Sequence, residues 1–243
     1  MRYGSGLGKG RAVLFFFCLV SSAGVVSDAQ ASQLKRLANV TRIISDSGED
    51  TGAESLQVSF ASGHSAFEFK RRTDTALARR WGMSRPRVEA ETEWLASCAT
   101  GACRDRRVEP WSKAVAVLRS APRKNRPALV QKLLSRRIDY VGDKAIDDHW
   151  ANPLATLLSG AGDCEDHALL KRAMLMAAGY SDAEVPLLVL ETAKGQGHMT
   201  LLVAHKDHVL VLDNRFRAAV PLSFLTSDKV VALASSAGYF TAR

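Results

Sequence analysis

The chain has 243 residues, which is enough for one sizeable domain or two small ones. Hydrophobic residues make up 47% of it, a fraction that suits a globular protein with a packed core. The formal net charge is +8, but no grouping of basic and aromatic residues indicates a nucleic-acid surface. We therefore predict a solvated basic surface and no nucleic-acid partner.

The first 31 residues have the pattern of a secretory signal peptide. A positively charged start precedes an apolar run over residues 12–26, and residues 29–31 read Ala-Gln-Ala, an A-x-A cleavage pattern. The apolar run is shorter than the ~20 residues that a membrane-spanning helix needs, which favours cleavage before Ser32 over retention as a membrane anchor. We therefore predict that residues 1–31 are removed and that the mature protein is exported.

Residues 32–80 form an N-terminal extension whose structure the sequence leaves unclear. Apolar and polar residues alternate over 56–60 and again over 66–69, which predicts a short hairpin that turns around Ser62-Gly63.

Short helices are expected on either side of residue 81. Residues 74–81 have a helical pattern that Arg85-Pro86 should end, and further helical patterns cover 89–96 and 111–118.

Cys98 and Cys103 flank a short loop that can close as a disulfide in an oxidising compartment. The alternative is two unpaired surface thiols, which export disfavours. Cys18 is removed with the signal peptide, so Cys164 remains as an unpaired cysteine and a candidate reactive thiol.

A clearer helix opens at Pro127, since proline suits the first position of a helix. Its apolar stripe consists of Val130, Leu133, Leu134, Ile138 and Val141. Residues 140–153 are expected to form a loop. A tight turn over 160–162 leads to a helix from Cys164 to Ala178, which Gly179 should end in the left-handed conformation. The stripe of this second helix consists of Leu169, Ala173 and Met176.

Three nearly apolar runs follow at residues 185–191, 199–204 and 208–212, and they predict strands that are covered on both faces. Helices come first, then a central helix, then antiparallel strands. This order predicts an α+β domain over residues 81–243, in which the central helix packs on an antiparallel sheet.

Cys164 stands among three acids in the run Gly162-Asp163-Cys164-Glu165-Asp166, at the start of the central helix. Carboxylates repel a thiolate, whereas the partial positive charge of a helix N-terminus and a nearby imidazolium favour it. His198 is the candidate for that imidazolium.

A simple register for the last hairpin places Val203 opposite His208, and His198 then falls opposite Asp213. Opposed residues share a face of the sheet with Cβ atoms ~5 Å apart, so this carboxylate would fix the tautomer of the imidazole. Each of these residues also has an ordinary structural explanation: a small buried cysteine, a packed histidine and an aspartate in a turn. Their joint pattern predicts a nucleophile, a base and an orienting residue.

A developing oxyanion would also need donors. Backbone N–H groups at the start of the central helix can hold it, and the side chain of Trp150 or Asn152 is the candidate for a second donor.

Several motifs carry a resemblance to a known family. They are Asp148-His149-Trp150, Asn152-Pro153, the run from Gly160 to Asp166, His198-Met199, and the run from Leu210 to Asn214. With their spacing, they resemble the bacterial transglutaminase-like cysteine peptidases of the LapG type over roughly residues 111–214.

The resemblance implies a papain-like or transglutaminase-like fold with Cys164 as nucleophile, His198 as base and Asp213 as orienting residue. Such enzymes are periplasmic endopeptidases that cleave a large surface adhesin of a biofilm near paired alanines. Some of them are sequestered by an inner-membrane receptor. The resemblance therefore implies an adhesin as substrate and such a receptor as partner.

Family members also bind calcium beside the nucleophile, and by position this role would fall on Asp163, Glu165 and Asp166. Carboxylate oxygens suit Ca²⁺, and a divalent cation would relieve their repulsion of the thiolate. The alternative is that Asp163 caps the helix while Glu165 and Asp166 complement its dipole.

Two other functions stay open. A transglutaminase-type acyl transferase would use the same nucleophile with an amine in place of water. A calcium-dependent binding module would carry an inactive Cys164.

Overall fold

The computed structural model describes residues 40–42, 55–60, 67–103, 105–143, 149–205 and 208–242. The expected signal peptide and the expected turn at Ser62-Gly63 lie outside these residues. Across the described ranges, no helix is both long enough and apolar enough to cross a membrane.

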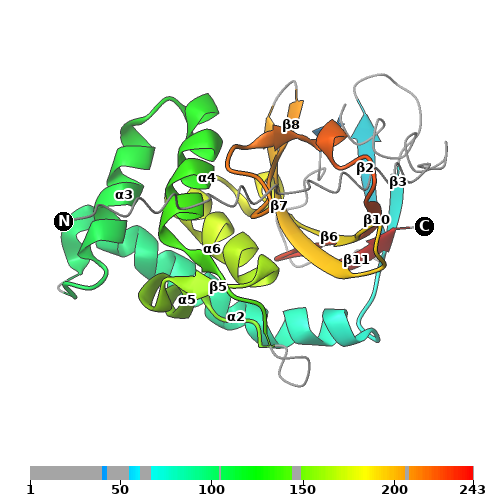
Figure 1. Cartoon of the computed structure of the whole chain (residues 1–243), viewed down its shortest axis with the longest axis horizontal. Helices are drawn as coiled ribbons and strands as arrows, with labels where there is room; N and C mark the ends of the chain where they lie inside the picture. The colour runs from blue at the N-terminus through cyan, green and yellow to red at the C-terminus, as the bar shows by residue number, and fades with distance from the viewer. Residues whose placement is uncertain are drawn as a thin grey trace, which may run out of the picture.

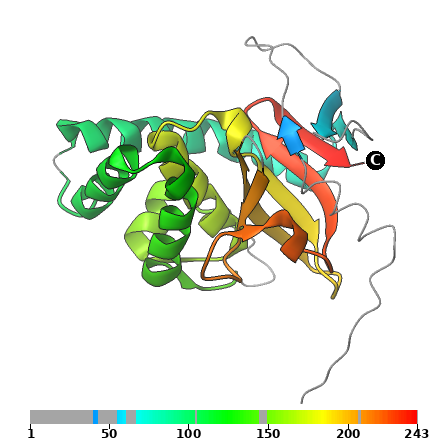
Figure 2. The same ribbon diagram turned by 90° about the horizontal axis from the view of Figure 1, so that it is seen from above.

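Most helices lie on one side of the molecule and the strands on the other, while α2 (Ala76–Ser97) extends from the helical side to the sheet, as Figures 1 and 2 show. The other helices are α3 (Glu109–Ser120), α4 (Arg126–Arg137), α5 (Pro153–Ser159) and α6 (Cys164–Ala177), with short helical turns η1 (Cys98–Ala102), η2 (Arg123–Asn125), η3 (Asp182–Glu184) and η4 (Leu222–Phe224). The strands of the large sheet are β1 (Val40–Arg42), β2 (Ser55–Phe60), β3 (Phe67–Arg71), β6 (Leu187–Glu191), β7 (Gly197–His205), β8 (His208–Leu212), β9 (Val220–Pro221), β10 (Lys229–Ser235) and β11 (Gly238–Ala242). A separate parallel pair joins β4 (Asp139–Tyr140) to β5 (Ala161–Gly162).

The large sheet has the strand order β1-β2-β3-β11-β10-β6-β7-β8-β9, and every neighbouring pair is antiparallel. The expected hairpin strands are β2 and β3, and they belong to this sheet because β3 pairs with β11. Helix α2 runs without a break across residue 80, where we had placed the domain boundary. The α+β prediction is confirmed, with α6 packed on an antiparallel sheet.

Both faces of the sheet are covered, as the apolar strands predicted. Alternate residues of β6 and β7 face the helices, among them Val189, Met199 and Leu201, whereas Leu188 and Leu202 lie in a second apolar cluster on the opposite face. Each fully buried Leu or Val side chain contributes about 1.5–3 kcal/mol of transfer free energy, so the sheet is held from two sides.

Helix α6 is enclosed on nearly all sides rather than along one stripe. It lies against α2, α4, α5 and β7. Besides the expected Leu169 and Ala173, it buries Leu170, Met174 and Leu175, and Met176 is only partly buried. The helix ends as predicted, since Gly179 has φ +94° and follows its last turn.

The predicted break at Pro86 is wrong, because α2 continues through it. Proline removes one helical hydrogen bond and strains the preceding turn, at a cost of about 3 kcal/mol. Trp81, Val88 and Leu95 are buried on both sides of Pro86, and this packing outweighs the local preference. Trp81 is fixed further by a 2.9 Å hydrogen bond from Nε1 to the carbonyl of Ser235.

The stripe predicted for α4 extends too far. The helix ends at Arg137, and Val141 lies beyond it with 56% of its surface exposed. The chain becomes extended there because β4 pairs with β5, with Asp139 N donating to the carbonyl of Gly160 at 2.8 Å. Helix α5 and strands β9, β10 and β11 were not predicted.

Candidate active site

Cys164 is the first residue of α6, and the backbone just before it is held by the carboxylate of Asp166, three residues after Asp163. Asp166 Oδ2 accepts a 3.2 Å hydrogen bond from Asp163 N, and its Oδ1 accepts one of 2.7 Å from Ala151 N. Gly162 allows this close approach, because a Cβ at that position would lie 2.6 Å from the Cβ of Asp166. The acid cluster therefore fixes the start of the helix.

The thiol of Cys164 has two polar neighbours. Its Sγ donates a 3.0 Å hydrogen bond to Glu165 Oε2 and accepts a 3.5 Å hydrogen bond from Met199 N. Burial and the carboxylate of Glu165 raise the pKa of Cys164 well above its usual value. In this arrangement the protonated thiol is favoured.

His198 and Asp213 are in contact, with 2.9 Å between Nε2 and Oδ2. The register predicted for their hairpin is wrong, since Val203 pairs with Leu210 instead of His208. This shift moves the pairing by two residues. A shift by two keeps every side chain on its face of the sheet, so the two residues become diagonal instead of direct neighbours and still meet.

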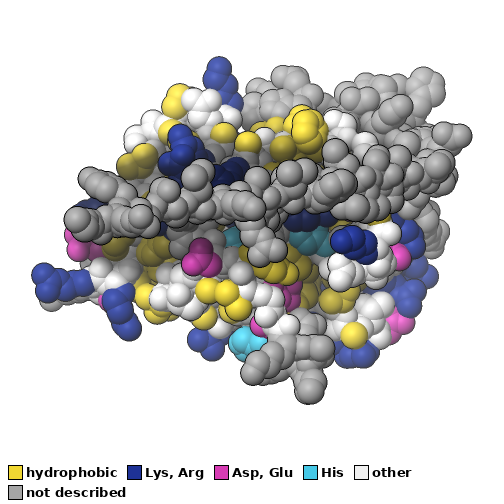
Figure 3. All heavy atoms as spheres, in the orientation of Figure 1, with side chains coloured by type: hydrophobic (Ala, Val, Ile, Leu, Met, Phe, Trp, Pro, Cys, Tyr) yellow, Lys and Arg dark blue, Asp and Glu magenta, His cyan; other side chains and the backbone are white. Residues whose placement is uncertain are grey.

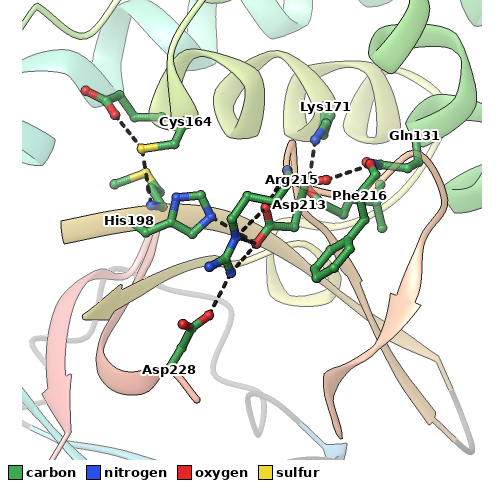
Figure 4. A network of polar contacts seen from close by, with 11 residues as sticks. Gln131, Cys164, Lys171, His198, Asp213, Arg215, Phe216 and Asp228 are labelled. Carbon is green, nitrogen blue, oxygen red and sulfur yellow. Dashed lines mark hydrogen bonds and ion pairs between the residues drawn. The ribbon is translucent and has the colours of Figure 1, made fainter. Parts of the chain in front are cut away.

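Asp213 is completely buried, and besides His198 it has a cationic partner, Arg215, that the sequence analysis missed. Arg215 donates to both of its carboxylate oxygens, and Arg215 Nη2 also contacts Asp228 Oδ2 at 2.7 Å (Figure 4). Burial alone would raise the pKa of Asp213, but hydrogen bonds from His198 and Arg215 outweigh it and hold this pKa below its usual range. Asp213 is therefore held as a carboxylate.

Two buried side chains hold the backbone around Asp213. Lys171 Nζ, from α6, donates a 2.9 Å hydrogen bond to the carbonyl of Leu212. Gln131 Nε2, from α4, donates to the carbonyls of Asp213, at 2.7 Å, and Phe216. The sequence held no signal for either of them, because both lie off the predicted apolar stripes and their burial is seen only in the structure. A buried polar group of this kind needs a partner.

Cys164, His198 and Met199 open into one cavity of about 360 Å³. Trp150 also lines it, together with the carboxylates of Asp163 and Glu165. Asn152 is not among its lining residues and instead occupies the N-cap position of α5. Of the two side chains considered as oxyanion donors, the structure places only Trp150 at the cavity.

Asp163, Cys164 and Glu165 form the one group among the described residues whose ligand atoms converge, all within 4.8 Å of one another. Burial raises the pKa of Glu165 to about 8, because its charge is poorly solvated and lies near that of Asp163. Clustered carboxylates of this kind fit a hard divalent cation. Asp166 lies outside the group, since each of its oxygens accepts a backbone N–H.

The other two cysteines of the described ranges are not among the residues that line this cavity. Cys98 and Cys103 are joined by a disulfide at η1, and Cys164 is the free cysteine of the described ranges. On the face shown in Figure 3, Lys and Arg side chains are spread among other residues instead of gathering in one patch.

Comparisons with known proteins place this geometry in a family. The model of the bacterial transglutaminase-like cysteine proteinases matches residues 91–227. No curated protein matches at a significant level.

Solved structures of Legionella pneumophila LapG share the fold. The calcium-bound form is 23% identical, with a TM-score of 0.53, over 62% of this chain and 87% of that chain. The EGTA-treated form is 24% identical, with a TM-score of 0.53, over 63% and 86%. Since the family model spans more than half of the sequence, the chain belongs to the bacterial transglutaminase-like cysteine proteinases and is a cysteine peptidase.

Proposed function

We propose that this peptidase is a periplasmic endopeptidase that works through Cys164, His198 and Asp213. The observation that carries the proposal is the 2.9 Å contact between His198 Nε2 and Asp213 Oδ2, made beside the cavity that also receives the thiol of Cys164. A nucleophile at a helix N-terminus, with a histidine oriented by a buried carboxylate, is the arrangement that thiol proteolysis needs.

The contact supports different roles for the two ring nitrogens of His198. Because ionised Asp213 accepts a hydrogen bond from Nε2, Nδ1 is left as the nitrogen that takes the proton of Cys164. The thiolate attacks the peptide carbonyl, and the imidazolium returns the proton to the leaving amine. Water then attacks the acyl-enzyme, with His198 as base, and releases the acid product and the thiol.

The tetrahedral oxyanion would be held by backbone N–H groups at the start of α6. Trp150 is the side-chain donor that we propose, since it lines the cavity beside Cys164.

Calcium binding at Asp163 and Glu165 is the second part of the proposal. These carboxylates converge on the thiol, and Glu165 accepts the hydrogen bond of Cys164. The family resemblance supports calcium, and one of the similar structures is named as calcium-bound. A bound cation would supply positive charge beside the thiol and would favour the ionised forms of Glu165 and Cys164. Glu165 would then turn from the thiol to the metal.

A surface adhesin as substrate, a sequestering inner-membrane receptor as partner and a periplasmic location rest on the resemblance and on the signal-peptide pattern of residues 1–31. Acyl transfer to an amine remains chemically available to the same nucleophile.

The test uses the mature chain from Ser32, incubated with surface and periplasmic proteins of its own source in calcium or in EGTA. We expect one large protein to be shortened in calcium, with a new N-terminus found by sequencing, and no cleavage with C164A. Fluorescent cadaverine in the same mixture detects acyl transfer as amine incorporation. Cleavage that persists in C164A would contradict the proposed nucleophile.

A further inference from the structure

We propose that Arg215 and Asp228 form a positioning pair that fixes the Asp213 carboxylate against His198, an inference that rests on the proposed triad. Asp213 and Arg215 are separated by one residue at the end of β8, and Asp228 lies just before β10. Figure 4 shows the contacts that link His198 to Asp213, Asp213 to Arg215, and Arg215 to Asp228.

The guanidinium of Arg215 holds both oxygens of the carboxylate. Its Nε lies 3.1 Å from each of Oδ1 and Oδ2 of Asp213, and its Nη2 lies 2.8 Å from Oδ2. The backbone N of Arg215 adds a 2.8 Å hydrogen bond to Oδ1. A carboxylate held at both oxygens cannot rotate about its Cβ–Cγ bond, so the oxygen that meets His198 stays in place.

The ion pairs of Arg215 with Asp213 and Asp228 lie in a largely buried setting, which strengthens them. Asp213 is 0% exposed and Asp228 is 3% exposed, whereas the Arg215 side chain is 34% exposed and covers them from the solvent side. An ion pair in such a setting is screened little by water or salt. It therefore differs from a surface salt bridge, which is worth ~0–1 kcal/mol.

Asp228 offsets the positive charge that Arg215 places beside Asp213. An arginine bound to Asp213 by itself would cancel the charge that Asp213 offers to the imidazolium. With Asp228 on the same guanidinium, the three charged groups carry a net charge of −1, like a lone carboxylate. The pair thus fixes the orientation of Asp213 while keeping a negative charge beside His198.

The contacts with Asp213 and Asp228 depend on the planar guanidinium of Arg215, whose N–H groups point in fixed directions. Lysine would keep the charge but could not hold two carboxylates in fixed directions. R215K is therefore a test of geometry, R215M removes both charge and fork, and D228N removes only the compensating charge. R217M is the matched control, because Arg217 is an exposed cation of the same segment that makes no ion pair among the described residues.

Two measurements on the mature chain in a fixed calcium concentration test the pair. The first is the rate at which iodoacetamide alkylates Cys164, with H198A as the reference for loss of the base. The second is the tautomer of His198, read from ¹⁵N shifts of the imidazole, which a merely structural role would leave unchanged.

We expect R215M to slow alkylation about 10- to 100-fold, as misplacement of a catalytic group does, and to give a mixture of His198 tautomers. R215K should remain slow, D228N should be slowed less, and R217M should match the parent. If H198A is slow while R215M and D228N match the parent in both readouts, the positioning role is overturned. If H198A itself labels at the parental rate, the proposed triad fails and the positioning role fails with it.

Discussion

Cys164 and Lys171 lie seven residues apart on α6, which places them two turns apart on the same side of the helix. Lys171 Nζ reaches the carbonyl of Leu212, the residue before Asp213, at 2.9 Å. The helix that begins with the proposed nucleophile is thus tied directly to the strand end that carries the proposed orienting residue. This tie sets the spacing between two of the three residues of the proposed triad.

Lys171 should give the protein a specific dependence of stability on pH. Burial lowers the pKa of Lys171 to about 7, from 10.5 when solvated, although the charge of Asp213 partly opposes this. Between these two values the unfolded chain binds the proton and the folded chain does not. The free energy of unfolding should therefore rise with pH in this window, by up to about 1.4 kcal/mol per pH unit.

Urea unfolding of the parent and K171M between pH 7 and pH 9 measures this effect. The parent should gain stability relative to K171M as pH rises. K132M is the control, since Lys132 is an exposed residue of α4. Equal pH slopes in the parent and K171M would contradict the buried, neutral lysine.

Calcium should bind more tightly as pH rises. Protons compete with the cation at Glu165, whose pKa burial raises to about 8, so affinity should increase up to that pH. Isothermal titration at pH 6, 7 and 8 measures the trend. E165Q should bind at least about tenfold more weakly, whereas E109Q, which removes an exposed acid of α3, should bind like the parent. If the calcium affinity changed neither with pH nor in E165Q, the cation would bind at another site.

Gly162 should tolerate no side chain. In G162A the new Cβ would lie 2.6 Å from the Cβ of Asp166, so the carboxylate that holds Asp163 N and Ala151 N must move. We expect a loss of about 1–3 kcal/mol in the free energy of unfolding, the usual cost of overpacking.

Gly82 is a matched control, at which the same substitution should raise the free energy of unfolding instead of lowering it. A Cβ added at Gly82, inside α2, meets no described atom within 4 Å. G82A should therefore stabilise the protein by about 0.5–1 kcal/mol through the helix preference of alanine. Thermal melts of both variants decide the comparison, and a G162A protein as stable as the parent would rule out the close approach.

Thiol counting tests the cysteine assignment. The mature chain should show one free thiol when unfolded without reductant and three after reduction, because Cys98 and Cys103 are joined and Cys164 is free. Replacing both Cys98 and Cys103 by serine should cost about 2 kcal/mol, as expected for so short a loop, and should leave Cys164 alkylation unchanged. Three free thiols before reduction would show that no disulfide forms.

The sequence predicted the parts of the site that depend on local or periodic signals. Cys164 follows a turn and opens a helix, and His198 and Asp213 share a face by parity alone, which is why the two-residue error in register did no harm. Arg215 and Asp228 were out of reach, because their role depends on the start of β10 meeting the end of β8.

The fold likewise has features that local sequence patterns predict and features that depend on long-range contacts. Local rules failed at Pro86, where burial of Trp81 and Val88 keeps α2 intact. The strand β10 had a readable signal in its apolar run over residues 230–234, but we did not predict it. Its place between β6 and β11 depends on pairing with strands distant in the sequence, which a local sequence pattern cannot predict.

The enclosure of α6 has a consequence for motion. A helix packed on all sides cannot tilt or unwind by itself, so its backbone amides should exchange with solvent only when the whole domain opens. Its first two residues, Cys164 and Glu165, nevertheless line the cavity. The thiol therefore stands at the end of a buried helix, and its position is maintained by the same free energy that keeps the chain folded.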